Sequence, residues 1–179
     1  MKAFFFVLAL LVNPVVTGGI YDFSLVSIGG TTIPLSQYAG KRLLIVVLPS
    51  DRTATDSADL GKLAALTAKY KTQLTVLGVP SYEGGYTDGQ LPSLKKFYSD
   101  VLGSQVVLTQ AVYTNKGSGS RQHGLFAWLT DKGRNGHFDM DVKGAGQKFL
   151  INGKGELSGV FDPGIGLNDR LIQRFIDQP

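Results

Sequence analysis

Six consecutive apolar residues, Leu43 to Leu48, constrain the fold more than any other stretch of this sequence. The run is too short to cross a membrane and half of it is β-branched, which is typical of a central strand buried on both faces. A polar turn over residues 49–55 follows, and apolar side chains then recur at helical spacing over residues 56–71. Because parallel α/β sheets place their sites where strands end, we expect any functional site to centre on residues 49–55.

A second buried strand is predicted at residues 74–79, so the chain reads as strand, helix, strand over this region. Such a unit is a right-handed crossover, which makes the two strands parallel neighbours in one sheet. The loop over residues 80–90 leaves the end of the second strand on the same side of the sheet as the 49–55 turn. We therefore expect these two loops to face each other.

Shorter patterns predict the remaining elements of a single domain. We expect an N-terminal hairpin, a third strand, a closing hairpin and three further helices. Two glycine-rich stretches are expected to be loops, and the second has room for a distorted strand. In chain order these elements are the hairpin of 20–26 and 32–35, the helix 91–98, the strand 106–109, the loop 115–122, the helix 123–130, the loop 131–146, the hairpin of 148–151 and 156–161, and the helix 167–176.

The first 18 residues have the form of a secretory signal. Lys2 precedes a short apolar run, and small residues at 17–19 permit cleavage. Asn13 and Pro14 interrupt the apolar stretch, which favours a cleaved signal over a membrane anchor. We expect a signal peptide at 1–18 and one exported domain at 19–179, periplasmic or secreted, with no membrane insertion after cleavage.

The chain contains no cysteine, and this excludes thiolate catalysis, thiolate metal sites and Cys-x-x-Cys redox chemistry. The formal net charge of +4 comes from lysines and arginines scattered along the sequence. No basic run is interleaved with aromatic residues, so the composition does not predict a nucleic-acid partner.

Four segments resemble glutathione peroxidases. Residues 20–47 contain a Y-D-F segment, an L-S-x-Y-x-G-K turn and an L-L-I-V strand in the order that is found at the start of that family. Residues 74–85, 123–129 and 148–157 are similar to its I-L-A-F-P, H-P-L-F-K-W-L and K-F-L-I-D segments. The resemblance implies a thioredoxin-like, three-layer α/β/α fold with a central mixed sheet and an N-terminal hairpin. It also implies hydroperoxide reduction in the response to oxidative stress.

The residues that carry out this chemistry in the family are missing here. Aligning the family's A-S-x-C-G turn on this chain puts Arg52 where the redox cysteine or selenocysteine stands. The family glutamine falls within Tyr82-Glu83, and Gly144 and Ala145 replace the family tryptophan and asparagine. An arginine is a permanent cation with no usable nucleophile. We therefore expect no catalytic residue, no cofactor and no thiol peroxidase activity.

The remaining polar residues suggest binding rather than catalysis. Arg52 is expected at a helix N-terminus, where backbone N–H groups favour anions, and Ser50 and Thr53 add hydroxyls. With Tyr82 and Glu83, these residues are candidates for binding a carboxylate, a phosphate or an acidic side chain of a partner. The alternative is that Arg52 forms a surface ion pair with one of three acids, Asp51, Asp56 or Glu83.

Two other groups of side chains deserve a test. One group consists of His137, Asp139 and Asp141, which alternate along the sequence and would share one face of an extended segment. Together with His123, they could form a metal site of oxygen and imidazole ligands. The alternative is that these side chains are simply solvated. Three tyrosines are candidates for lining an aromatic cleft or for packing: Tyr21, Tyr82 and Tyr86.

Three hypotheses remain open. The first is an exported glutathione-peroxidase-like protein that has lost peroxidase activity and binds an unknown small anion or protein partner. Its binding surface would be the former active-site rim, which comprises Arg52, Tyr82, Glu83 and residues 139–146. The second is a divergent peroxidase with a mechanism that needs no cysteine. The third is a structural component of an envelope assembly.

Overall fold

The computed structural model describes residues 19–49 and 54–177. The predicted signal peptide at 1–18 lies outside the described residues, as do Ser50, Arg52 and Thr53. In the part of the chain that is described, no helix combines the length and the apolar character needed to cross a membrane.

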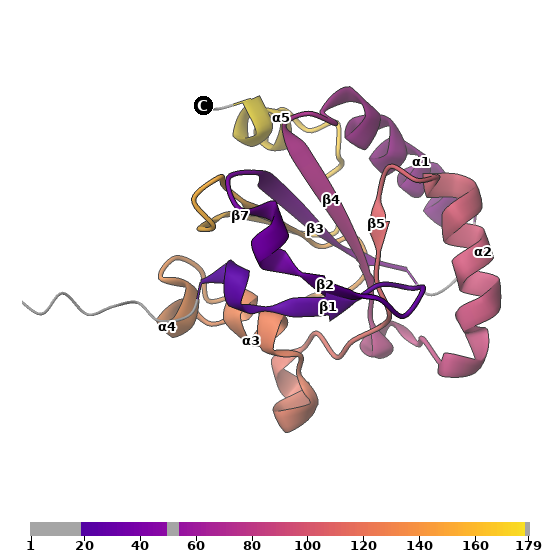
Figure 1. The fold of residues 1–179 in the computed structure, drawn as a ribbon, viewed down its shortest axis with the longest axis horizontal. Helices are drawn as coiled ribbons and strands as arrows, with labels where there is room; N and C mark the ends of the chain where they lie inside the picture. The colour runs from indigo at the N-terminus through magenta and orange to yellow at the C-terminus, as the bar shows by residue number, and fades with distance from the viewer. Residues whose placement is uncertain (1–18, 50–53, 178–179) are drawn as a thin grey trace, which may run out of the picture.

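A five-stranded mixed sheet with the strand order β5-β4-β3-β6-β7 forms the centre of the molecule (Figure 1). The run predicted as the central strand is the middle strand β3, and β4 pairs with it in parallel, as the crossover unit predicts. β5 continues the parallel half, whereas β6 and β7 form an antiparallel hairpin on the other side of β3. The strands are β3 (Arg42–Leu48), β4 (Leu74–Pro80), β5 (Val107–Leu108), β6 (Lys148–Ile151) and β7 (Leu157–Phe161).

Alternate residues of β3 enter two separate cores. Leu44, Val46 and Leu48 pack with the helices α1, α2 and α5, and Leu43 and Ile45 pack with α3 and the N-terminal segment. All five of these β3 side chains are at most 5% exposed, which is the burial expected of a strand covered on both faces. The helices are α1 (Ala54–Lys69), α2 (Leu91–Leu102), α3 (Gly124–Thr130), α4 (Lys132–Asn135) and α5 (Arg170–Asp177).

The N-terminal hairpin forms a small sheet of its own on the α3 side of the molecule (Figure 1). It is shorter than predicted, because residues 20–22 and 35–38 are 3-10 turns rather than strand. The hairpin consists of β1 (Ser24–Val26) and β2 (Thr32–Pro34), and the 3-10 helices are η1 (Ile20–Asp22), η2 (Leu35–Tyr38), η3 (Tyr82–Gly84), η4 (Asp88–Gln90) and η5 (Lys116–Arg121).

Both predicted loops contain helical turns. Residues 116–121 form η5 rather than an irregular loop. The 131–146 stretch contains the short helix α4 and not a distorted strand. Asp131 caps the start of this helix by accepting a hydrogen bond from Gly133 N at 2.8 Å. Gly136 ends the helix with a φ of 79°. The predicted closing helix begins three residues late, at Arg170, after a turn that contains Pro163.

Candidate functional site

Three segments meet at one edge of the sheet. β3 and β4 end side by side, with Leu48 opposite Pro80, and β6 begins there because it runs antiparallel to β3, with Lys148 opposite Val46. The loop that leaves β4 therefore lies beside the residues that precede β6. A cavity of about 110 Å³ lies between them and is lined by Ser81, Glu83, Gly84, Thr114, Asn115, Lys143, Gly144, Ala145 and the end of β3.

The cavity brings together the positions that the resemblance assigns to three members of the tetrad. Gly144 and Ala145 line it. Of the Tyr82-Glu83 pair, in which Tyr82 is the predicted match to the family glutamine, Glu83 lines it and Tyr82 does not. The fourth position, Arg52, lies outside the described residues. The prediction that the 49–55 turn faces the 80–90 loop therefore stays a prediction for Arg52. Gly144 and Ala145 offer no side-chain hydrogen-bonding group, so Glu83 is the ionisable group at these three positions.

The Glu83 carboxylate ties η3 to the segment that follows residue 113. It accepts hydrogen bonds from the backbone N–H groups of Thr114, at 3.0 and 3.1 Å, and Asn115, at 3.1 Å. The hydroxyls of Ser81, at 2.7 Å, and Ser118 also donate to it. A carboxylate held by so many donors is fixed in place as an anion and serves as a structural anchor.

These hydrogen bonds hold the pKa of Glu83 low. Partial burial alone would raise the pKa of this carboxyl, but the hydrogen bonds from Ser118, Thr114, Ser81 and Asn115 outweigh burial and lower it to about 2. The group is therefore a carboxylate at neutral pH. Unlike the neutral glutamine of the family, it has no proton to donate to a bound oxygen.

We expect Glu83→Gln to remove a pH-dependent part of the stability. The native pKa of Glu83, about 2, lies below the ordinary value of 4.5. Its contribution is therefore present above about pH 4.5 and is lost as the pH falls toward 2. Urea unfolding measures this contribution to the free energy of unfolding. The experiment covers about pH 5 to about pH 2 because this range spans the two pKa values. The Glu83→Gln profile should be flatter than that of the wild type, and parallel profiles would contradict the assignment.

Tyr82 belongs to an aromatic stack rather than to the cavity wall. Its ring stacks on Tyr113 with the centroids 4.8 Å apart and meets Tyr86 edge-on at 5.4 Å. Its hydroxyl donates to Asp88 at 3.0 Å, and Arg121 covers the far ring, Tyr113, at 4.4 Å. Tyr82 and Tyr86 therefore pack together, which is the packing alternative rather than an aromatic cleft. The third candidate, Tyr21, lies apart from the stack and donates instead to the carbonyl of Gly153.

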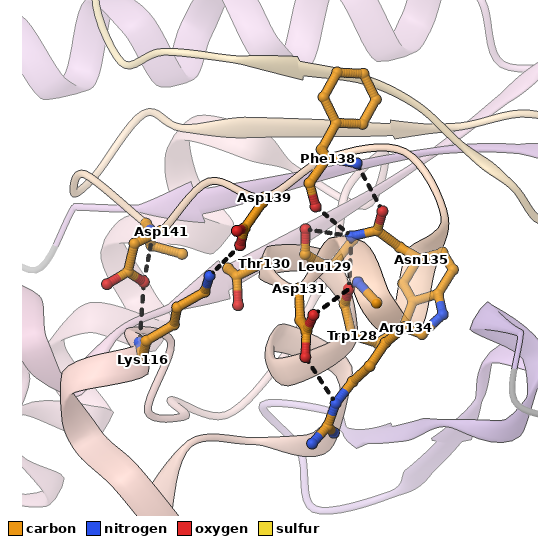
Figure 2. A network of polar contacts seen from close by, with 12 residues as sticks. Lys116, Trp128, Leu129, Thr130, Asp131, Arg134, Asn135, Phe138, Asp139 and Asp141 are labelled. Atoms are coloured by element: carbon orange, nitrogen blue, oxygen red, sulfur yellow. Dashed lines mark hydrogen bonds and ion pairs between the residues drawn. The ribbon is translucent and has the colours of Figure 1, made fainter.

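Asn135 anchors the loop that leads to Gly144 and Ala145 (Figure 2). Its side chain is only 7% exposed. The side-chain N–H groups donate to the carbonyls of Trp128, Leu129 and Phe138. The side-chain oxygen accepts from the backbone N–H groups of His137 and Phe138. One side chain thus joins the end of α3 to the following loop. The sequence reasoning missed Asn135, and the available signal was the Asn135-Gly136 pair, which is typical of a helix end or turn.

Two of the three predicted metal candidates, Asp139 and Asp141, contact Lys116 (Figure 2), whereas the ring centroid of His137 lies 6.5 Å from that of Phe138. The ammonium of Lys116 pairs with Asp139, and the backbone N–H of Lys116 donates to Asp141 at 2.9 Å. His123 instead caps α3 by accepting from Leu125 N at 3.2 Å, and burial lowers its pKa. Across residues 19–49 and 54–177, no group of three or more metal-binding side chains lies close enough to hold an ion.

The sequence and the fold are both similar to those of known glutathione peroxidases. The family model for glutathione peroxidase matches residues 20–130. Glutathione peroxidase 1 of Caenorhabditis elegans is 31% identical over 150 residues, which make up 80% of this chain and 86% of that protein. The crystal structure of Trgpx in apo form has a TM-score of 0.64 at 24% identity and covers 91% of this chain and 99% of its own. That of T. cruzi GPX1 has a TM-score of 0.63 at 21% identity, with coverage of 89% and 95%.

The mixed sheet between two helical layers, with a hairpin at its N-terminal end, defines a thioredoxin-like α/β protein. The family match extends over more than half of the chain. This chain belongs to the glutathione peroxidase family.

Proposed function

We propose that this member of the family has lost thiol peroxidase activity and acts as a binding or interaction module at the former active-site rim. The observation that carries the proposal is the absence of cysteine from all 179 residues. Peroxide reduction by this family requires a thiolate or selenolate that attacks the O–O bond and becomes an oxidised acid, which a thiol then reduces. No side chain of this sequence can enter that cycle.

The geometry of the rim supports the same conclusion. The carboxylate of Glu83 already accepts hydrogen bonds from the backbone N–H groups of Thr114 and Asn115. Gly144 and Ala145 contribute no group that could position a peroxide. These residues line a cavity of about 110 Å³, and a pocket that lacks the family's reactive groups supports a binding role.

We propose an anion as the ligand because of the residue types that the sequence places in the turn after β3. Ser50, Arg52 and Thr53 supply hydroxyl and guanidinium donors, which suit a small carboxylate or phosphate or an acidic side chain of a protein partner. We also propose that residues 1–18 direct export and that the domain functions in the periplasm or outside the cell, because their pattern is that of a signal peptide.

A titration with inorganic phosphate and with acetate, followed by backbone amide NMR, tests the anion-binding role. We expect shifts at Glu83, Lys143 and Gly144, and Arg52→Met should abolish them because it removes the guanidinium and keeps a long side chain. Arg170→Met makes the same change at an exposed residue at the start of α5 and should leave the shifts unaltered. If neither anion perturbs these amides, the anion-binding role is wrong.

A further inference from the structure

A second and larger cavity lies on the α1 side of the same sheet edge. Its volume is about 380 Å³, within the range of small-molecule sites. It lies between the end of β3, the first half of α1 and the loop that follows β7. Its apolar lining consists mainly of Val46, Leu48, Leu60, Leu63, Ile165 and Leu167.

The cavity wall contains a buried cation. Lys148, the first residue of β6, is only 4% exposed, and its ammonium donates a hydrogen bond to the carbonyl of Gly146. Asp59 and Lys62 also line the cavity, and the carboxylate of Asp59 pairs with Lys62 at 2.8 Å rather than with Lys148. Within the described residues, Lys148 therefore has no carboxylate at ion-pair distance, and an ammonium has three N–H donors to satisfy.

Burial of the Lys148 ammonium without a carboxylate partner among the described residues destabilises the folded protein. Burial lowers the pKa of Lys148, and the charge of Asp59 opposes that effect only in part. A buried charge is stabilised by a direct counter-charge with hydrogen bonds, and a ligand can supply one. An anionic group that entered the cavity would meet an ammonium that is largely shielded from water.

We propose that this cavity binds a small amphiphilic carboxylate, with the carboxylate on Lys148 and the hydrocarbon body against the leucine, isoleucine and valine side chains. The combination of one buried ammonium with the aliphatic part of the wall selects a ligand that is charged at one end only. The two cavities share Val47, Leu48 and Ala145 in their walls. Lys148 lines only this one and Glu83 lines only the other, so the two charged groups mark two distinct sites.

Hexanoate, with hexanol as its uncharged counterpart, is the probe for this site. We expect calorimetry to show hexanoate binding at least about tenfold more tightly than hexanol, because a charge-assisted hydrogen bond in a dry site contributes that much or more. Lys148→Met keeps the length of the side chain and should remove this preference. Lys96→Met, which alters an exposed lysine on α2, should retain it.

Methyl NMR locates the ligand without depending on any variant. The methyl groups of Leu60, Leu63, Ile165 and Leu167 should shift on addition of hexanoate, and the amides of Glu83 and Gly144 should not. Equal affinity for hexanoate and hexanol, unaltered preference in a folded Lys148→Met protein, or methyl shifts elsewhere would each overturn the proposal. Phosphate binding at the rim would be unaffected by any of these outcomes.

Discussion

Replacing Asn135 with alanine is expected to lower the free energy of unfolding by about 3 kcal/mol, because several buried backbone groups lose their partners together. The side-chain amide lies 2.9 Å from the carbonyl of Trp128 and 2.8 Å from that of Phe138. Its oxygen accepts from the N–H groups of His137 and Phe138, both at 2.8 Å.

Urea unfolding of two further variants completes this test. Asn135→Asp keeps the accepting oxygen but faces the carbonyl of Trp128 with a second oxygen, so it should be as destabilising as the alanine variant. Asn168→Ala makes the same deletion at an exposed residue and should cost less than about 0.5 kcal/mol. An Asn135→Ala protein as stable as the Asn168→Ala protein would contradict the anchoring role.

Phe149→Ala is expected to destabilise the protein by about 3–5 kcal/mol. Phe149 lies in the middle strand pair of the sheet, is 0% exposed and meets the ring of Phe126 edge-on with the centroids 6.0 Å apart. Removal of the ring leaves a cavity in the core between the sheet and α3, and that core has little freedom to collapse because β6 is paired on both sides.

Thermal and urea unfolding measure this effect against two comparisons. Phe149→Leu fills most of the space and should cost clearly less than the alanine variant. Leu171→Ala removes an apolar side chain that is 51% exposed, and it should have a small effect. If Phe149→Ala were no more destabilising than Leu171→Ala, the assignment of this core would be wrong.

The sheet could be predicted from the sequence because its signals are local. The uninterrupted Leu43 to Leu48 run, the helical spacing behind it and the 74–79 run confine the chain to a parallel crossover. The Asn152-Gly153 turn likewise fixes the closing hairpin. The two apolar runs are short and rich in β-branched residues, which favours strands, whereas the segment between them keeps the 3.6-residue period of a helix.

The 131–146 stretch was harder to predict because its structure depends on contacts rather than on periodicity. A four-residue helix is too short to show a period, and α4 is stabilised by its caps and by Asn135. The same holds for η5, whose first turn is tied to Glu83 through Asn115 and Ser118. Glycine-rich composition correctly indicated turns there, but it contained no information about the partners.

The candidate site was predicted as a region rather than as a set of roles. Alignment placed the family glutamine within Tyr82-Glu83, and the structure shows that Glu83 lines the cavity while Tyr82 stacks outside it. The sequence pattern identifies Lys148 only as the first residue of a strand. Its burial depends on α1 and on residues 163–167, which are distant in the sequence, so no local pattern could have shown it.

The central claim is that this family fold operates without the family's redox chemistry, and hydroperoxide turnover tests it most directly. The purified protein should consume hydrogen peroxide and an organic hydroperoxide no faster than buffer does, with either glutathione or thioredoxin as the reductant. An active glutathione peroxidase assayed in parallel verifies the conditions. Turnover above the buffer rate that persists after metal chelation and further purification would contradict the account and establish a peroxidase mechanism that needs no cysteine.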